Sequence, residues 1–215
     1  YPFPRARFDP SQAGRVLRDR GVRLACVGYF GHMWELYAMW GWIAVFLGDR
    51  IARDGHPDPP RAAVWAFAVI AAGFAGSWWA GAWSDRVGRT TSAALAMAVS
   101  GACALAIGPA SAGPLWGVLA IALVWGASVV ADSAQFSTIV TELAEPAYVG
   151  TALTLQLAIG FTLTVATLWL VPVLRDHRGW GAAFALLAPG PAVGIFAMLR
   201  LRSLPEAKRL AGGRG

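Results

Sequence analysis

The sequence predicts an all-α polytopic membrane protein with six transmembrane helices. Of its 215 residues, 57% are hydrophobic and 14% are charged, whereas a soluble domain carries about 25% charged residues. Apolar runs of about 20 residues, the length that a helix needs to cross the hydrocarbon of a bilayer, occur six times. The polar residues in these runs do not alternate with a period of two, so membrane-spanning strands are not expected.

The apolar runs divide the chain into three parts. Residues 24–200 form the expected transmembrane domain. Residues 1–23 precede it as a cytoplasmic linker or interfacial segment, in which Ser11 is suited to cap a short surface helix. Residues 201–215 follow it as a basic cytoplasmic tail, which we expect to be frayed. The expected spans are 24–47, 62–83, 90–108, 115–140, 149–174 and 180–199.

Two patterns predict how the spans are shaped and packed. Gly73, Gly76 and Ala80 place small side chains where a second helix can approach closely, so they predict a helix contact. Pro189 and Gly190 interrupt the last span and predict a kink there.

The distribution of basic residues predicts the orientation. An even number of spans places both ends of the chain on one side, and 13 of the 18 Lys and Arg residues lie on that side. The positive-inside rule makes it the cytoplasmic side. The net charge of +6 therefore indicates topology and gives no reason to expect nucleic acid binding. The excess of Arg over Lys suggests a GC-rich genome and hence a bacterial inner membrane.

The strongest local motif lies between the second and third expected spans, in the segment GAWSDRVGRTTSA. Gly88 can adopt a positive φ that most residues avoid. Asp85, beside Arg86 and Arg89, can tie neighbouring helix ends together by charge-assisted hydrogen bonds. Taken alone, this segment is an ordinary cytoplasmic turn.

The spacing of this motif resembles the signature G-x-x-x-D-R-x-G-R-[KR] of the major facilitator superfamily, although Thr90 stands where that family has a cation. The resemblance implies that the six spans are the C-terminal half of a secondary transporter, built as two inverted three-helix repeats. It also implies an N-terminal six-helix half of the same transporter as a partner, and a gating role for the loop. The matching positions are Gly81, Asp85, Arg86, Gly88 and Arg89.

Carboxyl and imidazole side chains occur within only two of the expected spans. His32 and Glu35 share a face of the first helix. His32 and Asp132 each lie eight residues, or about 12 Å, from the expected cytoplasmic ends of their helices. We expect these three residues to form a proton-coupling cluster, because a charged group at membrane depth is costly and usually functional. The remaining expected cavity residues are Gln135 and Gln156, as uncharged hydrogen-bond partners, and Tyr29.

The expected function is alternating-access transport of a small solute, coupled to protons, and Glu35→Gln is expected to impair gradient-driven uptake. None of the 18 basic residues lies within a span, which favours a neutral or cationic solute. No catalytic residue, metal or cofactor is predicted, and Cys26 and Cys103 lie in different spans, where small apolar roles are expected.

Three other interpretations remain open at this stage. His32, Glu35 and Asp132 are compatible with an intramembrane metal-dependent enzyme, although the chain has no HExxH or GxSxG motif. The chain is also compatible with a stand-alone six-helix structural protein. Finally, the polar side chains in the spans can simply fasten helices together.

Overall fold

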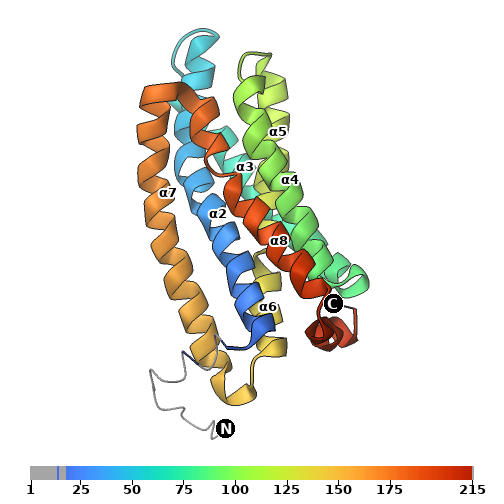
Figure 1. Cartoon of the computed structure of the whole chain (residues 1–215). Helices are drawn as coiled ribbons and strands as arrows, with labels where there is room; N and C mark the ends of the chain where they lie inside the picture. Colours follow the sequence, from blue (N-terminus) through green and yellow to red (C-terminus); the bar gives the residue numbers. More distant parts are fainter. Residues whose placement is uncertain (1–13, 15–17, 215) are drawn as a thin grey trace, which may run out of the picture.

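The computed structural model describes residue 14 and residues 18–214, and these form helices without a β-strand (Figure 1). Most of the expected linker, including Ser11, lies outside the described residues. The long helices run roughly side by side in one elongated bundle. In chain order the elements are α2 (Arg20–Arg53), α3 (Pro59–Val87), α4 (Arg89–Ala110), α5 (Leu115–Ala131), α6 (Ser133–Leu143), η1 (Pro146–Tyr148), α7 (Val149–Ala185), α8 (Pro189–Arg202) and η2 (Pro205–Gly212).

Four stretches of the described chain are long and apolar enough to cross a membrane, namely Pro59–Val87, Arg89–Ala110, Leu115–Leu143 and Pro146–Arg202. The prediction of an all-α membrane protein is confirmed at this level. The last stretch contains both of the final two expected spans, and α2, the first expected span, is not among the four. His32 and Glu35 lower the hydropathy of α2, although this helix has 34 residues.

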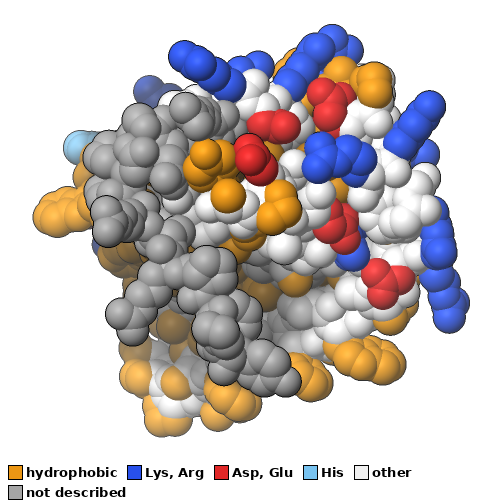
Figure 2. Space-filling view, turned by 90° about the horizontal axis from the view of Figure 1, so that it is seen from below, with side chains coloured by type: hydrophobic (Ala, Val, Ile, Leu, Met, Phe, Trp, Pro, Cys, Tyr) orange, Lys and Arg blue, Asp and Glu red, His pale blue; other side chains and the backbone are white. Residues whose placement is uncertain are grey.

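The surface of the bundle also fits a membrane. Large apolar side chains project from several helices, and the most exposed are Phe74 at 82% and Phe67 at 74% on α3, with Trp169 at 74% on α7. Such a surface is costly in water and natural against acyl chains. One end of the bundle carries Lys and Arg side chains around much of its rim, with Asp and Glu between them (Figure 2).

Two of the expected spans are not continuous helices. Span 115–140 is divided at Asp132, which separates α5 from α6. This break was not predicted. Asp side chains favour caps and turns over helix interiors, and here the N–H of Gln135 bonds to the carbonyl of Asp132 at 2.9 Å in a tighter turn. The chain also turns sharply at Gly179, where φ is 79°, and then breaks before Pro189. The second break confirms the predicted kink.

Helix α2 lies in the centre of the bundle and packs against α8, α7, α3 and α6. Its closest approach is to α8, because a Cβ atom at Gly31 would lie 2.3 Å from the carbonyl oxygen of Gly190. Helices α3 and α5 approach as closely, since a Cβ atom at Gly76 would lie 1.9 Å from the carbonyl oxygen of Ala127. The helix contact predicted from the small residues of α3 is therefore confirmed.

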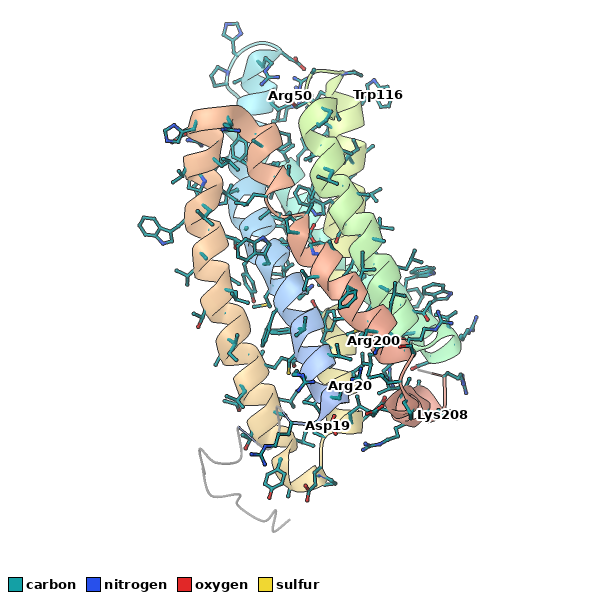
Figure 3. All side chains as sticks on the ribbon, viewed as in Figure 1. Asp19, Arg20, Arg50, Trp116, Arg200 and Lys208 are labelled. Atoms are coloured by element: carbon teal, nitrogen blue, oxygen red, sulfur yellow. The ribbon has the colours of Figure 1, made fainter. Side chains whose placement is uncertain are left out.

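The two ends of the bundle are held by polar contacts. At one end, the Arg50 guanidinium donates to the carbonyl of Gly113 at 2.6 Å and pairs with Asp54, which ties the α2–α3 connection to the α4–α5 connection. At the other end, the Asp19 carboxylate caps α2 by accepting from the N–H of Val22 at 2.9 Å. Figure 3 shows Arg50 and Trp116 at one end, and Asp19, Arg20, Arg200 and Lys208 at the other.

Candidate functional site

The best candidate site is a buried contact between His32 on α2 and Asp132 at the break that separates α5 from α6. His32 Nδ1 lies 2.9 Å from Asp132 Oδ1, and both residues are 2% exposed. The two groups are in contact, but the ring N–H is not aligned with Oδ1 as a hydrogen bond. On the other side of the ring, Nε2 lies 2.8 Å from the hydroxyl of Ser133. Both ring nitrogens therefore face polar groups of the broken helix.

Aromatic rings surround the imidazole. The centroid of the His32 ring lies 5.7 Å from that of Phe136 and 6.0 Å from that of Tyr29. Gly28 makes room for this packing, because a Cβ atom there would lie 2.7 Å from the Phe136 ring. The rings exclude water, so the attraction between an imidazolium and the Asp132 carboxylate is stronger here than at a surface. The same exclusion makes either charge costly when its partner is neutral.

Glu35 has different partners from those expected. Its Oε2 accepts from the hydroxyl of Ser100 on α4 at 2.8 Å, and its Oε1 accepts from Nε1 of Trp125 on α5 at 2.7 Å. A residue three positions along a helix is rotated by about 60° from the first, so Glu35 faces α4 and α5 while His32 faces the break. The carboxyl group of Glu35 therefore fastens three helices together.

Two amide side chains are buried beside this region with polar atoms that have no hydrogen-bond partner among the described residues. Gln156 on α7 has no exposed surface, and neither its Oε1 nor its Nε2 has a partner among the described residues. Gln135 on α6 is 3% exposed, and its Oε1 is also without a partner there. Gly160, one helical turn after Gln156, lies against the Tyr29 ring, since a Cβ atom there would be 2.5 Å from it. Buried amide atoms in the interior thus have no hydrogen-bond partner among the described side chains, although most buried polar groups in proteins have one.

Three further members of the site were not predicted. Ser133 was not singled out, although it follows Asp132 directly. Ser100 and Trp125 resemble many other serines and tryptophans in the chain. Only the packing of α2 against α4 and α5 shows that they meet Glu35.

The motif that includes Asp85, Arg86, Gly88 and Arg89 forms the connection between α3 and α4. Gly88 has a φ of 97°, which confirms the prediction for this position. Arg89 lies 3.5 Å from Asp85, but its stronger partner is Glu142, at the end of α6. Nε of Arg89 donates to both carboxylate oxygens of Glu142, at 2.9 and 3.0 Å, and Nη2 lies 2.8 Å from Oε1. The loop is therefore clamped to the same broken helix that carries Asp132.

The tail is docked on this clamp, so the prediction that the tail is frayed after Arg202 is wrong for residues 203–214. The N–H of Ala211 donates to Glu142 Oε2 at 3.1 Å, and Arg209 donates to the carbonyl of Leu143 at 2.9 Å. Arg214 donates to the carbonyl of Asp85. Leu210 has no exposed surface. The basic side chains of the tail thus meet free carbonyl groups at helix ends, and an apolar residue anchors the segment.

We expect the clamp to contribute measurably to stability. In a double-mutant cycle of Arg89→Gln and Glu142→Gln, the coupling in the free energy of unfolding should be about 1 kcal/mol, the upper range for partly exposed pairs, because the contact is bidentate. It should decrease when salt is added. Chemical unfolding in detergent measures it. The adjacent pair Arg175 and Asp176, of which Asp176 is 61% exposed, is the matched control and should show a smaller coupling; equal couplings would contradict the clamp.

Within residue 14 and residues 18–214, no group of three or more His, Cys, Asp and Glu side chains is arranged to hold a metal ion. His32 and Asp132 are joined to each other, and Glu35 accepts its hydrogen bonds from Ser100 and Trp125. The arrangement places an imidazole beside a buried carboxylate and a hydroxyl. No protein-family model and no curated protein sequence matches this chain.

Proposed function

We propose that the chain is the C-terminal half of a secondary transporter that moves a small solute by alternating access and couples this movement to protons. The observation that carries the proposal is the buried contact between His32 and Asp132 at a helix break. Interrupted membrane helices and ionisable side chains at membrane depth are typical of transporter binding sites. The buried amide of Gln156 has no hydrogen-bond partner among the described residues, so it can bond to a solute or to water.

The proposed coupling step is a change of charge at His32. With the imidazole protonated, its attraction to the Asp132 carboxylate holds α2 against the break. Loss of the proton leaves a buried carboxylate without its charged partner, which costs about 3–5 kcal/mol. A shift from 1:99 to 99:1 between two states needs about 5.5 kcal/mol. Protonation of His32 can therefore supply most of the free energy that is needed to shift the equilibrium between the two transport conformations.

The motif between α3 and α4 supports the architecture of the proposal. Its resemblance to the major facilitator superfamily motif implies two inverted three-helix repeats, with α2 and α5–α6 as the first helix of each. Asp85 and Arg86 are exposed at the end of α3 and would contact the N-terminal half when the cytoplasmic side is closed. Both ends of the chain are then cytoplasmic, in a bacterial inner membrane. The gating residues are Gly81, Asp85, Arg86, Gly88 and Arg89.

The proposed solute is neutral or cationic. Arg50 is the most enclosed described basic residue, at 4% exposure, and it is already bound to Gly113 and Asp54 at the end of the bundle opposite the motif. The interior offers carboxylates, amides and an imidazole, which suit a cation or a hydrogen-bonding neutral molecule.

A stand-alone structural protein is the second candidate, because Glu35 fastens three helices and performs no evident step in transport. The two candidates differ in what precedes Tyr1. A segment with six spans and its own copy of the motif, encoded directly upstream, is expected if the chain is half of a transporter. A start codon directly before the codon for Tyr1 would favour the structural protein.

The test of function is uptake by proteoliposomes that contain the protein with every segment its gene encodes. Radiolabelled sugars, neutral amino acids and quaternary amines are offered outside, with the vesicle interior made alkaline. We expect accumulation of at least one class and its collapse when a protonophore is added. Accumulation that survives the protonophore would contradict proton coupling, and no flux of any class would contradict the transport proposal.

A further inference from the structure

An apolar groove opens on the side of the bundle where α3, α4 and α5 meet, outside the proposed transport site. Its volume is about 320 Å³. Trp79 and Trp83 of α3 form one wall, Leu95 and Val99 of α4 the other, and Val124 of α5 contributes to its lining. Ser128, a polar residue of the lining, donates its hydroxyl to the carbonyl of Val124 at 2.8 Å. The groove therefore offers its occupant little hydrogen bonding and a large apolar contact.

The inner end of the groove and Arg86 are about one leaflet apart. It begins at Gly76, and Arg86 follows ten residues later on the same helix. At 1.5 Å per residue this distance is about 15 Å, which is half of the roughly 30 Å thickness of the hydrocarbon. Trp79 and Trp83 stack at 5.2 Å with an angle of 15° between their planes. Tryptophan is enriched where membrane helices meet the lipid headgroups.

The charges at the open end favour an anion. Arg86 follows Trp83 by three residues, so both side chains lie on one face of α3. Arg86 is exposed and makes no ion pair or hydrogen bond with another described residue. Arg89 is neutralised by Glu142, and Arg214, which binds the carbonyl of Asp85, offsets the exposed Asp85 carboxylate, so the charge of Arg86 remains in excess at this end.

We propose that this groove binds one acyl chain of an anionic phospholipid, with the phosphate of its headgroup at Arg86. The apolar walls hold the chain, the stacked tryptophans lie beside the glycerol region, and the guanidinium selects the charge of the headgroup. The bound lipid fills the gap between α3 and α4 and adds apolar contact next to the gating motif.

The test is native mass spectrometry of the protein released from nanodiscs made of equal parts of phosphatidylglycerol and phosphatidylethanolamine. We expect the parent protein to retain one lipid with a preference for phosphatidylglycerol. Arg86→Gln should reduce this preference about five-fold, because one arginine near an anionic surface contributes about 1 kcal/mol to binding. Arg202→Gln is the matched control, because Arg202 is exposed at the same end but belongs to α8, which contributes no residue to the groove, whereas Arg86 lies one turn beyond the lining residue Trp83. It should leave the preference unchanged.

A second variant tests the groove without changing charge. Ala96→Leu adds bulk to the lining and should abolish retention of either lipid, while circular dichroism shows the same helix content as the parent. An unchanged preference in Arg86→Gln would overturn the proposal, as would a lipid retained by the correctly folded Ala96→Leu variant. A second copy of the chain bound in place of lipid would overturn it as well.

Discussion

Replacing Gly126 by alanine is expected to prevent α3 and α5 from packing as they do. A Cβ atom at Gly126 would lie 1.9 Å from the carbonyl oxygen of Val69, and backbone cannot move aside as a flexible side chain can. Overpacking usually costs 1–3 kcal/mol, and this contact should cost about 3 kcal/mol or more, because the helices must separate. For a chain of this size the melting temperature should fall by about 6–12 °C.

Gly117→Ala in the same helix is the matched control. A Cβ atom at Gly117 would meet nothing within 4 Å, and alanine is a better helix former than glycine by about 0.5–1 kcal/mol. The control should therefore melt at the same temperature or slightly above the parent. Thermal unfolding of the purified variants in one detergent measures both. Equal melting temperatures for the two variants would show that α3 and α5 are not in close backbone contact.

Replacing Asp132 by asparagine is expected to abolish accumulation of the solute against its gradient. The amide keeps the size of the side chain, so α5 and α6 should fold as before, but no charge remains to attract the imidazolium of His32. Without that attraction, protonation of His32 no longer favours one transport conformation over the other. Exchange of labelled for unlabelled solute, which needs no net proton movement, should continue. Accumulation and exchange are measured on the same proteoliposomes.

Glu35→Gln is the control that separates the two buried carboxyl groups. Glutamine can accept from Nε1 of Trp125 with its carbonyl and donate to the Ser100 hydroxyl with its amide, so the fastening role of Glu35 survives the change. We therefore expect accumulation close to that of the parent, in place of the impairment expected from sequence. Accumulation lost in Glu35→Gln and preserved in Asp132→Asn would assign the proton to Glu35 and contradict the proposed role of His32 and Asp132.

The features that depend on local chemistry could be predicted from the sequence. The positive φ of Gly88 followed from the short connection in which it lies, and the close contact at Gly76 followed from the spacing of small residues. The interruption before Pro189 followed from the missing N–H and the fixed φ of proline.

The features that depend on how helices rotate against each other could not be predicted. Glu35 and His32 lie on nearly the same face of α2, and only the packing of α4 and α5 directs Glu35 to Ser100 and Trp125. The break at Asp132 was hidden because a single aspartate is compatible with either a helix or a turn. The tail was expected to be frayed from its composition, yet Glu142 lies 69 residues from Ala211, to which it bonds. Contacts over such separations leave no local pattern.

The most direct test of the account is proton movement driven by the solute alone. Proteoliposomes that enclose a pH-sensitive dye, with no pH gradient and no membrane potential, are given an inward gradient of the solute identified by uptake. We predict that the interior acidifies with the parent protein and that Asp132→Asn, while still exchanging solute, produces no change. Acidification of equal rate in Asp132→Asn would contradict the account, because the coupled proton would then pass without the pair that His32 forms with Asp132.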